Sequence, residues 1–182
     1  FDHVSLVGII HADQLIHHPG FRSHERAFQL MMQVAGRAGR KHKKGKVLIQ
    51  TSDPAHPVIQ NVLNSDYKKM YETERLTRMQ FQYPPFIRMI EVTLKHKTIQ
   101  TIEKASLFLA NELRKTNTAN ILGPSTPFIS KINNFYIREI LIKSGLQQIE
   151  LQRSKNALQS IVDKMKTIAE LKSVDVNIDV DP

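Results

Sequence analysis

The chain has 182 residues and a formal net charge of +9, from 26 Lys and Arg against 17 Asp and Glu. Apolar residues make up 41% of the chain and cysteine is absent, which excludes a disulfide framework and a thiolate zinc site within this segment. The sequence contains no run of about eighteen apolar residues, which excludes a membrane-spanning helix. We expect one ordinary domain or two small ones, and the positive charge favours a polyanionic partner such as nucleic acid.

The first third of the chain predicts an α/β unit. Residues 4–10 (VSLVGII) are typical of a buried strand, and residues 46–51 (KVLIQT) predict a second one. Between them a helix should begin near Ser23, because apolar residues recur at helical spacing at Phe28, Met31, Met32 and Ala35. Two strands are too few for a stable sheet. We therefore expect the chain to be the later part of a longer protein.

The rest of the chain predicts a second domain with a different pattern. Two connecting helices should cover residues 56–63 and 67–79, before the Pro84-Pro85 pair interrupts the chain. Strands and helices then alternate as β-α-β-β-α-β, the ferredoxin-like or split βαβ arrangement, over residues 87–94, 98–115, 121–122, 135–143, 158–169 and 174–180. We divide the chain into residues 1–63, a connector at 64–81 and an α+β domain at 82–182.

The segment richest in chemistry is Gln33-Val34-Ala35-Gly36-Arg37-Ala38-Gly39-Arg40. Two arginines three positions apart at a helix end relaxed by glycine present planar forks that suit phosphate oxygens. Glycine also lets a partner approach the backbone closely. In phosphoryl transfer, an arginine stabilises the charge that develops on the transferred group. The alternative is a basic helix end exposed to solvent.

The segment resembles motif VI of superfamily 2 helicases, whose arginines reach the triphosphate across a cleft between two motor lobes. The resemblance implies that Arg40 is the arginine finger, that Arg37 is a second phosphate or inter-lobe contact, and that Gln33 is their polar partner. It also implies that residues 1–63 are the C-terminal part of a RecA-like second lobe. Other superfamily 2 members, such as recombination helicases, share this motif.

Surrounding residues narrow the resemblance to the primosomal protein N′ (PriA) family of replication-restart helicases. They are Ala12-Asp13-Gln14-Leu15, Phe21-Arg22-Ser23, Glu25-Arg26, Tyr83-Pro84-Pro85-Phe86, Leu122-Gly123-Pro124 and the closing Asp179-Val180-Asp181-Pro182. The family implies ATP and Mg²⁺ as cofactors, with most of that site upstream of this chain, and zinc in an upstream segment. It implies forked and single-stranded DNA, the single-stranded DNA-binding protein and other primosome proteins as partners, and a cytoplasmic, nucleoid-associated location.

Several further residues are candidates for nucleotide, DNA or partner contacts. Asp13 resembles an acidic position near the family's motif V, with an ordinary turn aspartate as the alternative. The basic run offers DNA contacts at Lys41, Lys43 and Lys44, with a solvated charge run as the alternative. In the second domain Tyr136 and Arg138 on one strand are candidates for contacts with single-stranded nucleic acid, with a residue at the edge of the core as the alternative for Tyr136. Lys131 and Lys143 are further candidates. Lys155 with Gln159 could hold the acidic tail of the single-stranded DNA-binding protein.

Two other interpretations remain to be weighed. Seven of the eight histidines lie within residues 3–56, but no pair has ligand spacing beside a carboxylate, so we expect no metal site here. The chain also contains no glycine-rich loop ending in Lys-Ser or Lys-Thr. It could therefore be a nucleic-acid or protein-binding module of ferredoxin-like fold without motor activity.

Overall fold

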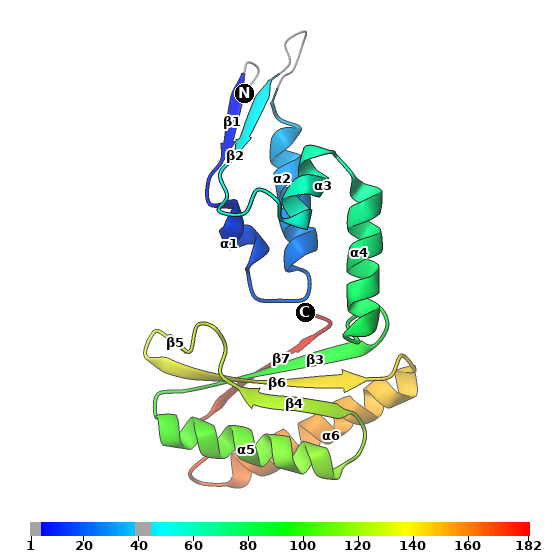
Figure 1. Cartoon of the computed structure of the whole chain (residues 1–182). Coiled ribbons are helices and arrows are strands. Elements are labelled where there is room, and N and C mark those ends of the chain that lie inside the picture. The colour runs from blue at the N-terminus through cyan, green and yellow to red at the C-terminus, as the bar shows by residue number, and fades with distance from the viewer. Residues whose placement is uncertain (1–4, 39–44) are drawn as a thin grey trace. The chain divides into compact units, whose positions relative to one another are not determined.

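The computed structural model describes residues 5–38 and 45–182, and the chain separates into two compact units, residues 1–80 and 81–182 (Figure 1). Both units combine helices with β-strands, so the predicted mixed α/β class is confirmed. The elements of the first unit are, in chain order, β1 (Leu6–Ile9), α1 (Ala12–Ile16), α2 (Ser23–Ala35), β2 (Lys46–Ile49), α3 (Pro57–Leu63) and α4 (Tyr67–Gln80).

The first unit is built on two parallel strands, β1 and β2, with Leu6 opposite Lys46 and Ile9 opposite Ile49. The predicted strand, helix, strand order is confirmed, but α1 was not predicted from the sequence. At the start of this short helix the Ala12 N–H donates to the carbonyl of Gln50 at 3.0 Å, which links the segments that follow β1 and β2. One face of α2 packs into the core through Ala27, Phe28 and Met31.

The second unit is a sheet with its two long helices on one face (Figure 1). Its elements are β3 (Arg88–His96), α5 (Ile99–Lys115), β4 (Asn120–Ser125), β5 (Lys131–Ile132), β6 (Phe135–Ser144), α6 (Gln148–Thr167) and β7 (Asp175–Val180). The strands lie in the order β4-β6-β3-β7, every neighbouring pair is antiparallel, and β5 extends the unit as a hairpin with β6.

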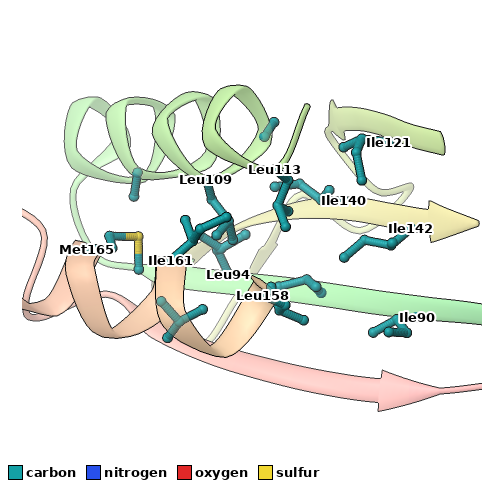
Figure 2. Close-up of a cluster of buried hydrophobic side chains, with 14 of the residues drawn as sticks. Ile90, Leu94, Leu109, Leu113, Ile121, Ile140, Ile142, Leu158, Ile161 and Met165 are labelled. Carbon is teal, nitrogen blue, oxygen red and sulfur yellow. The ribbon is translucent and has the colours of Figure 1, made fainter. Parts of the chain in front are cut away.

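Alternation along β3 and β6 decides which face becomes the core. Ile90 lies opposite Ile142 and Val92 opposite Ile140, and all four side chains belong to the buried core. Figure 2 shows the three isoleucines next to the helices. From α5 and α6 the core receives Leu109, Leu113, Leu158, Ile161 and Met165. Because successive strand residues point to opposite faces, Glu91, Glu139 and Lys143 lie on the other face of the sheet.

Two predicted details of the second unit are wrong. The last helix was expected to include Ile168 and Ala169, but α6 ends at Thr167, because Ile168 adopts an extended backbone (φ −81°, ψ 119°). Ile168 still packs against the core, and the turn that follows adds the buried side chains of Leu171 and Val174. Strand β5 was not expected either. Its two residues pair with the beginning of β6 across Asn133 and Asn134.

Gly123 occupies a position in β4 that excludes a side chain. Its φ is +96°, and a Cβ atom there would lie 2.8 Å from the carbonyl oxygen of Glu139 on β6. The pairing of β4 with β6 shifts its register between Leu122 and Ser125, as at a β-bulge. The Gly123 carbonyl accepts a hydrogen bond from the Arg114 guanidinium of α5. The packing of this sheet therefore explains the glycine of the Leu-Gly-Pro segment.

Asp181 joins the C-terminal end of β7 to the start of β3. Its Oδ1 accepts a hydrogen bond from the Met89 N–H at 2.9 Å, its Oδ2 lies 2.7 Å from an Arg88 guanidinium nitrogen, and its own N–H donates to the Met89 carbonyl at 2.7 Å. One aspartate thus extends the β3–β7 ladder by a side chain and a backbone contact. The closing Asp-Val-Asp-Pro segment is also structural.

We predict that Asp181→Ala lowers the free energy of unfolding of the second unit by about 1–3 kcal/mol, because the Met89 N–H and the partly exposed Arg88 guanidinium lose their acceptor. Denaturant unfolding monitored by circular dichroism would measure the change. Asp179→Ala is the matched control on the same strand. Burial and the Asp179 carboxylate raise the pKa of Glu91, so removing Asp179 relieves repulsion. Equal losses in both variants would contradict the role of Asp181.

Candidate functional site

The motif VI-like segment begins on the exposed face of α2 and continues past its end. Gln33 and Arg37 are both exposed, and α2 ends at Ala35 with Gly36 as the capping residue. The Arg37 N–H donates to the Val34 carbonyl at 3.1 Å, which continues the turn by one step. A shallow hollow on this face is lined by Arg26, Gln29, Leu30 and Gln33. The face is therefore open to solvent and mixes basic, polar and apolar side chains next to the positions expected to meet a nucleotide.

Gly36 has no steric requirement within the described residues. Its φ is −64°, and a Cβ atom there would lie 3.5 Å from the nearest backbone oxygen, that of Met32, which is ordinary contact. In this respect Gly36 differs from Gly123. Of the other residues assigned to this site, Arg40, Lys41, Lys43 and Lys44 lie outside the described residues.

Asp13 lies on α1, where its carboxylate closes a local hydrogen-bond cluster. Oδ1 accepts from the Thr51 hydroxyl at 2.5 Å, and Oδ2 accepts from the N–H and the hydroxyl of Ser52 at 2.8 and 2.9 Å. The Thr51 hydrogen bond, with those from Ser52, lowers the pKa of Asp13. The carboxylate therefore holds the loop after β2 against α1.

The structure does not bring Asp13 and Arg37 together. Asp13 follows the carboxyl end of β1, whereas Arg37 lies beyond the far end of α2, on the way to the amino end of β2. The 13 residues of α2 span about 20 Å between these opposite ends of the two strands. Asp13 and Arg37 were grouped in one nucleotide site from the sequence, and the geometry separates them.

Charged and aromatic side chains brace α2 against α4 in the first unit. Arg78 reaches Glu25 at 2.5 Å, and His24 Nδ1 lies 3.2 Å from the buried carboxylate of Glu74. Arg22 and Arg78 lie 5.2 and 5.3 Å from the ring centroid of Phe21. The Phe-Arg-Ser and Glu-Arg segments therefore contribute to the packing of this helix pair.

Three histidines meet edge to face in the first unit, with His56 5.5 Å from His24 and 6.1 Å from His17 between ring centroids. His56 Nδ1 accepts from the Val58 N–H at 3.2 Å and caps α3. Burial, with His24 close by, lowers the pKa of His56, which keeps this acceptor neutral. Within residues 5–38 and 45–182, no group of three or more His, Cys, Asp or Glu side chains could hold a metal ion.

The candidates on β6 are already engaged by other parts of the second unit. Arg138 lies on the helix side of the sheet, where its guanidinium contacts Glu103 of α5 at 3.2 Å. Tyr136 is partly buried against the core, and the Lys131 ammonium lies 4.8 Å from its ring centroid. Lys131 itself is exposed on β5.

Lys143 lies on the opposite face from Arg138. Its ammonium donates to the Phe81 carbonyl at 2.7 Å and lies 4.4 Å from the ring centroid of Tyr83, and burial lowers its pKa. These contacts tie the Tyr-Pro-Pro-Phe segment to the sheet. Lys143 therefore has a structural role that the sequence did not indicate.

Lys155 and Gln159 lie one turn apart within α6 rather than at its start, since α6 begins at Gln148. Gln159 is exposed, and its amide donates to Asp163 at 2.8 Å. The two side chains share one face of the helix, as their spacing predicts.

Sequence reasoning missed the exposed residues around β5. Phe128 is 91% exposed and Ile129 is 57% exposed, immediately before the hairpin. The available signal was Asn133-Asn134 between two apolar residues, because asparagine tolerates the positive φ that a two-residue hairpin turn requires. Both asparagines have positive φ, 48° and 66°.

Residues 79–182, more than half of the chain and covering the whole second unit, match the family model described as the primosomal protein N C-terminal domain. The chain therefore belongs to that family.

Relatives extend the similarity to the first unit. The replication restart protein PriA of Bacillus subtilis is 38% identical over 184 aligned residues that cover 100% of this chain and 22% of the relative. That of Treponema pallidum is 35% identical over 100% of this chain and 27% of the relative, and that of a Synechocystis strain is 36% identical over 98% and 21%. The chain thus spans about a fifth to a quarter of the length of these relatives. Within the described residues, no helix is both long and apolar enough to cross a membrane.

We predict that Asp13→Asn lowers the Tm of the first unit at neutral pH, because the ionised carboxylate accepts three hydrogen bonds that a neutral amide satisfies less well. The pKa of Asp13 is lowered in the folded state. Its contribution is therefore present above the unfolded pKa of about 3.9 and is lost as pH falls through the folded pKa. Thermal melts across pH would measure a difference that disappears in acid. A constant difference would contradict the assignment.

Proposed function

We propose that this chain is part of an ATP-dependent DNA helicase that recognises stalled forks and initiates primosome assembly for replication restart. The observation that carries the proposal is the Gln-x-x-Gly-Arg-x-Gly-Arg sequence that starts at Gln33, in a chain that matches PriA proteins along its whole length. Residues 1–63 are then the C-terminal part of a RecA-like second lobe, 64–81 the connector and 82–182 the C-terminal domain.

The topology of the second unit supports a ferredoxin-like assignment. Apart from the two-residue β5, its elements follow the order β-α-β-β-α-β. The later strand β6 inserts between β3 and β4, and β7 lies on the other side of β3, with both helices on one face. This is the arrangement that splits each βαβ unit by an intervening antiparallel strand.

In the proposed mechanism, ATP binds to the first motor lobe and supplies a γ-phosphate to which the second lobe responds. Arg37, just beyond the end of α2, would approach that phosphate together with Arg40, and Gln33 would fix their orientation. The Gly36 backbone supports this proposal, because it leaves room for a close approach and nothing within the described chain uses that room. Mg²⁺ would be held mainly by groups outside this chain.

The exposed face of α2 would then meet the first lobe. Arg26, Leu30 and Gln33 recur at helical spacing toward Arg37, and Leu30 is 46% exposed. A partly apolar stripe that ends in an arginine suits a contact that closes and opens with the nucleotide state. DNA contacts are proposed for Lys41, Lys43, Lys44 and Lys131, and a protein contact for Lys155 with Gln159.

We predict that Arg40→Ala in the full-length enzyme reduces unwinding by about 10³-fold or more, because an arginine finger stabilises the transition state of phosphoryl transfer. Affinity for forked DNA should be largely unchanged, because the finger contacts the nucleotide rather than the DNA. Strand displacement and fluorescence anisotropy would measure the two quantities. Arg75→Ala, at an exposed position of α4, is the matched control and should unwind normally. Retained unwinding by Arg40→Ala would exclude the finger role.

We also predict that the 182-residue chain hydrolyses no ATP by itself, with or without DNA. The chain contains no glycine-rich loop ending in Lys-Ser or Lys-Thr to hold the β- and γ-phosphates. A coupled phosphate-release assay would detect turnover. A rate that rises on addition of DNA would show that the chain carries a complete site of its own.

A further inference from the structure

The imidazole of His56 is the side chain that caps the start of α3. Its Nδ1 accepts the Val58 N–H at 3.2 Å, and Pro57 occupies the first position of the helix. Because the donor is a backbone N–H, Nδ1 must be the unprotonated nitrogen of the ring, and the ring proton lies on Nε2. The cap therefore requires the neutral form of His56 in one particular tautomer.

The capped helix holds part of the core of the first unit. Val58 and Ile59 are both buried, and α3 packs against α2 and α4. The side-chain amide of Gln60 also donates to the Pro54 carbonyl at 2.8 Å. The loop after β2 and the first turn of α3 are thus linked to each other, and a change at the cap affects both.

Titratable groups from several elements surround His56. The ring of His24, on α2, lies 5.5 Å away between centroids, and that of His17, which follows α1, lies 6.1 Å away. Burial first, and then the positive charge of His24, lower the pKa of His56, and His17 acts in the same direction. Asp53 in the preceding loop and Asp13 on α1 oppose this shift without cancelling it.

The neighbouring histidine has a counter-ion of its own. The Nδ1 of His24 lies 3.2 Å from the buried carboxylate of Glu74 on α4, which Arg78 approaches to 3.9 Å. A positive charge on His24 is therefore paired. A positive charge on His56 would instead cost the hydrogen bond from Val58 and would lie beside a second imidazole.

We propose that His56 is an acid-sensitive cap, whose protonation releases the start of α3 and the loop that joins this helix to β2. A protonated imidazole carries an N–H at both nitrogens and accepts no hydrogen bond. Its Nδ1–H would then face the Val58 N–H, two donors with no acceptor between them. The same loop carries Thr51, which binds Asp13, so the release extends toward α1. This inference concerns the fold of the first unit and does not depend on the proposed helicase function.

The direction of the pH dependence follows from the lowered pKa of His56. In an unfolded chain this pKa is about 6.5, so the folded chain favours the neutral ring. The cap therefore contributes its full stability above about pH 6.5, and this contribution is lost as the pH falls through the folded pKa. Asp13 loses its hydrogen bonds only in stronger acid, below its own unfolded pKa of about 3.9, so the two effects occur in separate ranges of pH.

The test is a ¹⁵N NMR titration of the 182-residue chain between about pH 8 and pH 5, the range in which histidine changes its charge. At the upper end, Nε2 of His56 should carry the ring proton. As Nδ1 takes up the second proton, hydrogen exchange at the Gln60 N–H, which donates to the His56 carbonyl at 3.0 Å, should lose its protection at the same midpoint. Protection of the Met31 N–H, within α2, should persist after correction for the intrinsic effect of pH on exchange.

Three variants test the cause. His56→Asn keeps a cap that does not titrate. Between pH 8 and pH 5, the Tm of the wild-type first unit should fall by about 4–8 °C more than that of His56→Asn, the shift that one lost cap produces in a unit of this size. His24→Gln keeps a donor to Glu74 without a charge, so it should raise the midpoint of the His56 titration. His18→Asn, at an exposed histidine of the same unit, is the matched control and should match wild type.

Three results would overturn the inference. The first is a Gln60 N–H that stays protected while the His56 ring takes up its second proton, because the cap would then not control the start of α3. The second is a ring proton on Nδ1 at neutral pH. The third is an acid-induced loss of protection that persists in His56→Asn, which would assign the effect to another group. The wild-type titration decides the first two even where a variant fails to fold.

Discussion

The pairing of β3 with β6 is the constraint on which the second unit depends. Nine residues of each strand pair in one uninterrupted register, from Arg88 opposite Ser144 to His96 opposite Tyr136. That register places Ile90, Ile140 and Ile142 on the face that the helices cover, and a slip of one residue would turn them to the other face. The register also places Arg138 next to Glu103 and Lys143 next to Tyr83. The first two residues of β6 pair with β5. The core and the candidate surfaces are therefore consequences of one ladder.

Several segments that mark the family are explained by packing rather than by chemistry. Gly123 is required because β4 passes too close to the Glu139 carbonyl for any side chain. Asp181 joins the last strand to the first, and Tyr83 lies beneath the Lys143 ammonium. These residues build the sheet that carries the hairpin. Gly36 is different, since nothing in the described part of the chain demands a glycine there, which supports a role toward a partner outside it.

The first unit separates two features that lie only 24 positions apart in the sequence. The Asp13 carboxylate accepts hydrogen bonds from Thr51 and Ser52 near the carboxyl ends of the two strands, and Arg37 is exposed on the way to the amino end of β2. The helix between them sets this distance. A cluster of three hydrogen bonds around Asp13 therefore stabilises the first unit, while the exposed face of α2 remains available for the proposed contact with a nucleotide and the first motor lobe. The hydrogen bonds of Asp13 and the exposed face of α2 thus lie in different parts of the first unit.

Apolar periodicity determined most of the helices and strands, because the alternation along residues 88–94 and the helical spacing along α2 and α6 each suit one kind of element. The Gln-x-x-Gly-Arg-x-Gly-Arg spacing also determined the family resemblance and the choice of Arg37. Only the tertiary structure decided which polar residues were already engaged. Arg138, Lys143 and Asp13 read as candidates along the chain, but their partners Glu103, Phe81 and Thr51 lie far from them in sequence. The exposure of Phe128 could not be predicted from the sequence, because the burial of a side chain depends on which neighbours the strand pairing brings close to it.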